Sequence, residues 1–277
     1  MLFLALLHPI VTIDWWRWSI HPSTAIGIAA LGAVYLWAAH HFRRTPTAKQ
    51  QICFFSGLLV MFASLNGPLH DLSDGYLFSA HMVQHLILTL LMPPLLIAGT
   101  PDWMLRPALS NRSVATAARF LTRGPVAFVV FNVVIAAWHL PPLYNAAMGN
   151  HDIHILQHLM FMPAAVLMWW PLMSALPELP RLAYPGQMLY SWLMTIPMTI
   201  IAIYIAMADS ILYPAYVSAP RFFAFSPLED QLLGALIMWI PGGIVFYVIM
   251  TIVFFKWNAR GEDSTAGAQV DWKPSAA

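Results

Sequence analysis

Two short stretches of the chain share one pattern of histidine and glutamine. "HMVQHLIL" covers residues 81–88 and "HILQHLMF" covers residues 154–161, and both read His-x-x-Gln-His-Leu. Side chains four residues apart lie on one face of a helix, with their Cβ atoms about 5–6 Å apart. The two histidines of each stretch could therefore bind one metal ion together.

The four imidazoles predicted to bind the metal are those of His81, His85, His154 and His158. His151 lies about one helical turn before His154 and would share much the same face of its helix. Gln84 and Gln157 each precede a motif histidine by one residue, so they lie about 100° around the helix from it. We expect these amides to hydrogen-bond imidazole N–H groups or bound water.

The elements that must position these residues are membrane helices. The chain of 277 residues is 60% hydrophobic and only 9% charged, whereas a soluble domain has about 25% charged residues. Its apolar residues form blocks of membrane-crossing length, roughly 17–25 residues, rather than the ~10-residue alternating segments of a β-barrel. The sequence therefore predicts an all-α, polytopic membrane protein.

Seven spans can be drawn, and they would form one bundle over residues 22–256. The predicted spans are residues 22–42, 51–66, 76–98, 125–147, 153–175, 187–208 and 231–256. Residues 1–21 are expected to form an interfacial N-terminal segment, because they lack the basic start and small-residue cleavage site of a signal peptide. Residues 257–277 are polar and rich in small side chains, which predicts a disordered tail.

The basic residues predict the orientation of the bundle. If the connecting segments alternate sides, the N-terminal side holds only Arg17 and Arg221, and the other eleven of the thirteen basic residues lie opposite. Cytoplasmic segments carry the excess of Lys and Arg, so we expect the N-terminus outside and the C-terminus in the cytoplasm. Nine of the eleven histidines then lie at the outer face, all except His40 and His41.

A group of histidines at one membrane face indicates a site. Besides the two motifs, the outer face would hold His70, His139 and His151, and ionisable groups in membrane helices are costly and usually functional. Imidazole suits copper, zinc, iron and nickel. Cys53 is the only cysteine, which excludes a Cys-x-x-Cys metal or redox motif. No nucleophile motif or basic cluster indicates an enzyme or a nucleic-acid partner.

Longer blocks around these residues resemble a known family. The blocks are "HMVQHLILTLLMPPLLIAGTP", "WHLPPLYNAAMGNHDIHILQHLMFMPAAVLMWWP", "LYPAY" and "SPLEDQLLGALIMWIPGG". Together, over roughly residues 60–256, they resemble the CtaG family of bacterial cytochrome c oxidase assembly factors. This family is distinct from a single-span, Cys-bearing copper chaperone that sometimes carries the same name. Cys53 lies in no such Cys motif, which excludes that second kind of protein here.

The resemblance implies a seven-span protein of the bacterial inner membrane that matures haem-copper oxidases and helps supply copper to the catalytic subunit. It implies no enzymatic activity, and it adds a periplasmic copper donor as a candidate partner beside the oxidase and membrane lipid. The metal candidates at matching positions are His81, His85, His139, His151, His154 and His158. Gln84, Gln157, His70, Asp71 and Asp230 are candidates for supporting roles or extra ligands, and Asp230 could instead cap the last span.

Three other functions remain open at this point. A membrane di-iron hydroxylase also uses His-x-x-x-His pairs, but on the cytoplasmic side. A haem-b electron carrier needs one axial histidine from each of two facing helices. The second histidine in each motif, four residues from the first, would then have no explanation. A scaffold could bind oxidase subunits without any metal.

Overall fold

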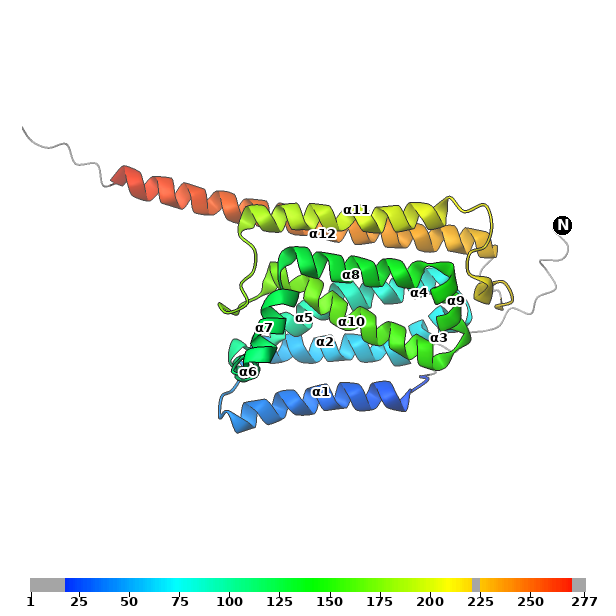
Figure 1. Cartoon of the computed structure of the whole chain (residues 1–277), viewed down its shortest axis with the longest axis horizontal. Helices are drawn as coiled ribbons and strands as arrows, with labels where there is room; N and C mark the ends of the chain where they lie inside the picture. Colours follow the sequence, from blue (N-terminus) through cyan, green and yellow to red (C-terminus); the bar gives the residue numbers. More distant parts are fainter. Residues whose placement is uncertain (1–17, 221–224, 271–277) are drawn as a thin grey trace, which may run out of the picture.

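The protein is a bundle of helices that run side by side along one axis (Figure 1). The computed structural model describes residues 18–220 and 225–270, and every regular element within these ranges is a helix. Among the described residues, six helices are long and apolar enough to cross a membrane, and a bent pair, angled by 75°, would make a seventh. The predicted all-α membrane fold is confirmed.

The helices follow one another with short connections. They are α1 (Pro22–His41), α2 (Ala48–Asn66), α3 (Pro68–Gly75), α4 (Phe78–Leu86), the π-helical turn η1 (Ile87–Leu91), α5 (Met92–Gly99), α6 (Asp102–Leu109), α7 (Arg112–Leu121), α8 (Gly124–His139), α9 (Pro141–Gly149), α10 (His151–Met173), α11 (Tyr184–Ala206), the 3-10 turn η2 (Pro214–Tyr216) and α12 (Pro227–Val270). The bent pair is α7 with α8.

The predicted fourth span, residues 125–147, is broken into two helices. α8 ends at His139, and Leu140 has an extended backbone with ψ 132°. The cause is Pro141, since proline disfavours helical backbone in the residue before it and fits the first position of a new helix. The short helix α9 therefore turns across the end of the bundle instead of continuing the span.

The third span is continuous in direction but contains a π-helical turn between α4 and α5. Pro93 has no backbone N–H to donate to the carbonyl of Thr89, four residues earlier. The indole Nε1–H of Trp169 on α10 donates to that carbonyl instead, at 2.8 Å. A cross-helix hydrogen bond thus satisfies the broken backbone and ties α10 to the helix that carries the first histidine motif.

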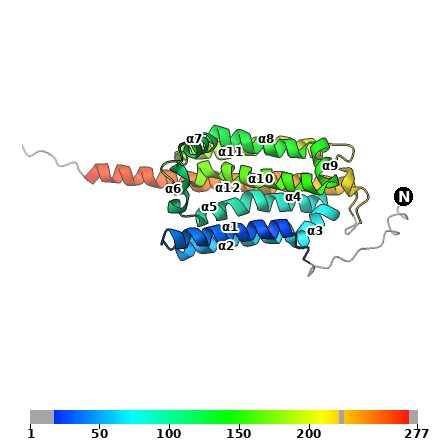
Figure 2. The same ribbon diagram turned by 60° about the horizontal axis from the view of Figure 1, so that its bottom comes forward.

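The two motif helices lie in the middle of the bundle. α10 packs against α8, η1 and α5, while α4 packs against α3 and α12. α1 lies at the periphery and packs mainly against α2 (Figure 2). The α4–α12 contact needs Gly234, because a Cβ atom there would come within 2.4 Å of the Phe78 ring.

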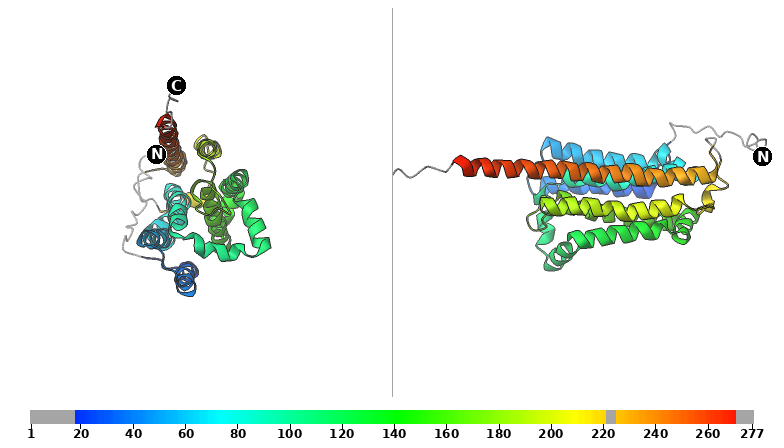
Figure 3. Two further views of the ribbon diagram at one scale, coloured as in Figure 1. Left: turned by 90° about the vertical axis from the view of Figure 1, so that its left-hand side faces the viewer. Right: turned by 90° about the horizontal axis from the view of Figure 1, so that it is seen from above.

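The two ends of the bundle differ. α3 and α9 lie at one end, and α6 and α7 lie at the other (Figure 1). α12 runs past the other helices as a single rod and stays helical to Val270 (Figure 3), whereas a disordered tail was expected from residue 257. A helix that is already formed extends at little cost. Residues 1–17 of the predicted N-terminal segment lie outside the residues that the structure describes.

Candidate metal centre

The four motif imidazoles converge from α4 and α10 near the α3–α9 end of the bundle. Within each motif, the ring centroids lie 4.2 Å apart for His81 and His85, and 4.7 Å apart for His154 and His158. Across the two helices, His81 lies 5.9 Å from His154, and His85 lies 5.9 Å from His158. The rings thus form two facing pairs.

These side chains are buried, with at most 8% of each residue exposed. The Nε2 atoms of His154 and His158 lie 3.0 Å apart. Two imidazole nitrogens bound to one tetrahedral ion at 2.0–2.1 Å would be separated by about 3.3 Å. The two rings of α10 therefore direct their Nε2 atoms at one point, and in the metal-free protein one of these atoms donates a hydrogen bond to the other.

His139 joins this group from the end of α8. Its ring lies 5.9 Å from that of His85 and is buried. Its Nδ1 lies 2.7 Å from the carbonyl oxygen of Ile135. Because a carbonyl only accepts, Nδ1 carries the proton and the lone pair of the neutral ring is on Nε2. His139 can thus offer Nε2 to an ion.

Many polar atoms of this cluster lack partners. Among the described residues, eight buried side-chain atoms here have no hydrogen-bond partner: Nδ1 and Nε2 of His81, Nδ1 and Nε2 of His85, Nε2 of His139, Nδ1 of His158, and Nε2 and Oε1 of Gln157. A buried polar group left unsatisfied costs about 1–3 kcal/mol. Such a concentration of unpaired donors and acceptors fits a group of atoms that binds an ion or ordered water.

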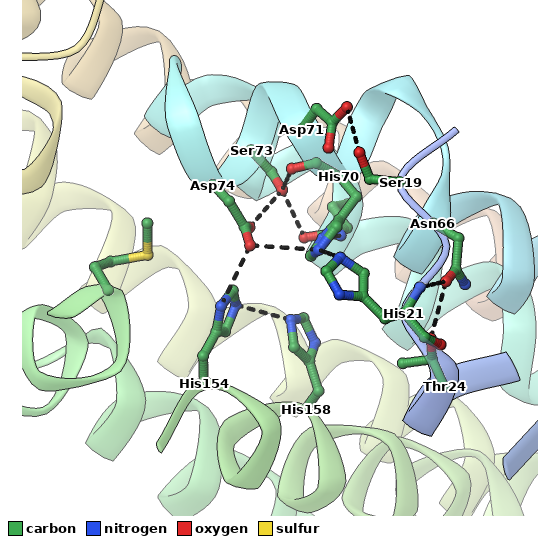
Figure 4. Close-up of polar contacts among 12 residues, drawn as sticks. Ser19, His21, Thr24, Asn66, His70, Asp71, Ser73, Asp74, His154 and His158 are labelled. Carbon is green, nitrogen blue, oxygen red and sulfur yellow. Dashed lines mark hydrogen bonds and ion pairs between the residues drawn. The ribbon is translucent and has the colours of Figure 1, made fainter. Parts of the chain in front are cut away.

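A second set of polar residues lies between the cluster and the end of the bundle (Figure 4). Asp74 Oδ2 lies 3.5 Å from His70 Nε2 and 3.4 Å from His154 Nδ1. His70 Nε2 also lies 3.0 Å from His21 Nε2. Asp74, His81 and His154 each offer a possible ligand atom within 4.8 Å of the others'. The carboxylate of Asp74 thus connects the two sets.

Burial favours the neutral form of two imidazoles, those of His70 and His21. It lowers the pKa of His70 below its ordinary value, although the charge of Asp74 acts in the opposite direction. Burial likewise lowers the pKa of His21, which is further lowered by His70 and His151. Neutral imidazole is the form that binds metal, so the surroundings favour the ligand form.

Asp74 was not among the residues singled out from the sequence. It lies four residues after His70, so the same i, i+4 rule that identified the motifs would have paired the two. That rule applies only within a helix, and the segment between the predicted spans 51–66 and 76–98 has the composition of a connecting loop. In the structure they contain the helix α3.

The supporting candidates lie in different places. Gln84 donates from Nε2 to the carbonyl of Ser64 at 2.6 Å and contacts Nδ1 of His70 at 3.2 Å, so it serves His70 rather than its own motif. Asp71 accepts a hydrogen bond from Ser19 Oγ, away from the rings (Figure 4).

Asp230 caps a helix, but not its own. Its carboxylate accepts hydrogen bonds from the backbone N–H groups of Phe78 and Ser79, at 2.7 and 3.3 Å. These groups belong to the first turn of α4, which carries His81. α12 itself begins with a reciprocal pair between Ser226 and Glu229. Capping of the last span was one of the roles open to Asp230, and in the structure its carboxylate instead caps the start of the third span.

A pocket of about 70 Å³, lined by residues of α1, α2, α3 and α10, reaches His154 and His158. Its polar lining consists mainly of His21, His70, Asp74, His151, His154 and His158. His151 is exposed and its ring lies 5.9 Å from that of His21, so it lies at the mouth of this pocket rather than among the buried rings. The pocket therefore connects the surface with His154 and His158 on α10.

Comparison with known proteins agrees with the resemblance drawn from the motifs. The family model described as cytochrome c oxidase caa3 assembly factor (Caa3_CtaG) matches residues 33–260. No curated protein and no solved structure matches the chain. The match includes both histidine motifs, α3 and Asp230, and it covers most of the chain. The protein therefore belongs to the Caa3_CtaG family of cytochrome c oxidase assembly factors.

Proposed function

We propose that this assembly factor binds copper between its two histidine motifs and supplies it to the catalytic subunit of a haem-copper oxidase. The observation that carries the proposal is the group of buried imidazoles on α4, α8 and α10, in which six ring nitrogens have no partner among the described residues. Imidazole is a good ligand for copper, and a copper-containing enzyme is what such a factor would complete.

The arrangement suits delivery better than catalysis. The ligands come from separate helices, α4 and α10, so a small change in the separation of the helices would weaken the site and release the ion. His81, His85, His154 and His158 would hold the ion, with His139 as a further ligand. We assign no catalytic residue, and the protein acts as an assembly factor rather than as an enzyme.

The basic residues support a placement for the site. The eleven-to-two asymmetry of Lys and Arg favours an orientation with the α3–α9 end outside and the C-terminus in the cytoplasm. In the inner membrane of a bacterium, with residues 22–256 as the membrane domain surrounded by lipid, the pocket would face the periplasm. A periplasmic copper donor could then load the site.

The proposal is tested in cells that lack the gene. They should make oxidase polypeptide and haem normally but show low oxidase activity, and added copper should restore part of it. Single alanine variants of the four motif histidines should reproduce the deletion without lowering the amount of this protein in the membrane. The matched control is alanine at His40 and His41, which are exposed at the far end of α1. Normal oxidase maturation in all four variants would contradict the copper role.

A further inference from the structure

A chain of polar contacts leads from the backbone of α2 to the candidate ligand His154. It runs through Gln84, His70 and Asp74 in turn. Each contact limits which atom of the next group carries a proton. The chain therefore determines which nitrogen of His154 can bind an ion.

The first link fixes the amide of Gln84. Its Nε2 lies 2.6 Å from the carbonyl oxygen of Ser64, and a carbonyl only accepts, so this amide atom must be the NH₂ group. Exchanging the amide oxygen and nitrogen would place two oxygens in contact. Oε1 accepts from Ser73 Oγ at 3.0 Å, which agrees with the same orientation.

The second link fixes the proton of His70. The NH₂ group of Gln84 lies 3.2 Å from His70 Nδ1, so Nδ1 must accept and the proton of the neutral ring is on Nε2. That N–H faces Asp74 Oδ2 and His21 Nε2. His70 therefore has no lone pair directed at the cluster, and its role is to position Asp74.

The third link acts on His154. Its Nδ1 lies 3.4 Å from Asp74 Oδ2, and a carboxylate favours a proton on the nitrogen that faces it. The lone pair of His154 is then on Nε2, which points toward His158 Nε2 (Figure 4). Metal-binding histidines commonly have a carboxylate on the other ring nitrogen, and its loss typically costs 10–100-fold in affinity.

We propose that Asp74, held by His70 and Gln84, is a positioning residue that keeps the proton of His154 on Nδ1 and so presents Nε2 of His154 as a ligand. This inference rests on the proposed function only for the identity of the ion. The proton positions belong to the metal-free protein and can be measured without copper.

The test combines nitrogen-15 NMR of histidine-labelled, metal-free protein with a Cu(I) competition titration. The His154 and His70 signals are identified by their loss in the corresponding alanine variants. The wild-type protein should show the proton on Nδ1 of His154 and on Nε2 of His70. The opposite tautomer at either residue in the wild-type protein would overturn the proposal.

Asp74→Asn is the second arm. The amide removes the negative charge that favours a proton on Nδ1 of His154, so the proton should no longer be held there and copper affinity should fall about 10–100-fold. Asp71→Asn, the same change on the same helix, should alter neither readout. Unchanged affinity in Asp74→Asn beside normal wild-type binding would refute the positioning role. A wild-type protein that binds no copper would instead refute the proposed function.

Discussion

The carboxylate of Asp230 lies 2.7 Å from the backbone nitrogen of Phe78, although 152 residues separate them in the chain. The first N–H groups of a helix have no partner within it, and a negative charge is favourable at that end. The last helix of the bundle thus completes the first turn of α4. His81 follows within one turn, so this contact sets where the first motif begins.

Replacing Asp230 by Ala should destabilise the protein and loosen the site. The buried N–H groups of Phe78 and Ser79 would lose their acceptor, at a cost of about 1–3 kcal/mol. We expect a lower thermal midpoint in detergent and weaker copper binding in the same variant. Asp209→Ala, an exposed carboxylate in a loop, should change neither. Equal stability of the two variants would show that the cap contributes nothing.

The orientation of the bundle is tested with reporter fusions. A reporter that is active only in the cytoplasm should work when fused near Thr47 or Ser110, which lie beside α2 and α7 at the basic end. It should fail near Asn145 or Ala219, at the end that holds the histidines. The reverse pattern would place the metal centre in the cytoplasm and would contradict delivery from the outer face.

The i, i+4 rule predicted the central pairs because it depends only on local helix geometry. It located His81 with His85 and His154 with His158. The break after His139 could also be predicted from the sequence, since Pro141 marks it. The long apolar run of residues 125–147 instead favoured one continuous span. Contacts between segments that are far apart in the sequence cannot be predicted from such local patterns.

Asp74 and Asp230 illustrate what the sequence leaves open. Asp74 acts from a short helix, α3, inside a segment with the composition of a loop. Asp230 acts on a helix 152 residues away, and nothing in its local pattern distinguishes that role from capping its own helix. Such roles depend on the packing of α12 against α4, which a periodic pattern does not specify.

Gln157 offers a test that separates binding from packing. It is fully buried, and both polar atoms of its amide lack partners among the described residues. Gln157→Met, which keeps the shape, should raise the stability of the metal-free protein by about 1–3 kcal/mol and weaken copper binding severalfold. Unfolding and competition titrations measure the two effects. A destabilised variant with unchanged binding would assign the amide a structural role.

Acid should weaken copper binding only below the ordinary range of histidine. Burial lowers the pKa of His70 and of His21, which lie outside the membrane-spanning helices, below 6.5. A lowered pKa means that the neutral form persists to lower pH. Protonation of His70 at Nδ1 would break its contact with Gln84 and disturb the chain that holds Asp74. Cu(I) affinity should be the same at about pH 7.5 and 6.5 and should fall at lower pH. A tenfold loss already between those two values would contradict this.

The most direct test is the metal content and absorption spectrum of the purified protein and of two double variants. We expect stoichiometric copper, no haem Soret band and no iron in the wild type. His81→Ala with His85→Ala should remove most of the copper, and so should His154→Ala with His158→Ala, because both pairs form one site. A Soret band, iron without haem, or wild-type levels of copper in both double variants would contradict a copper site built from the two motifs.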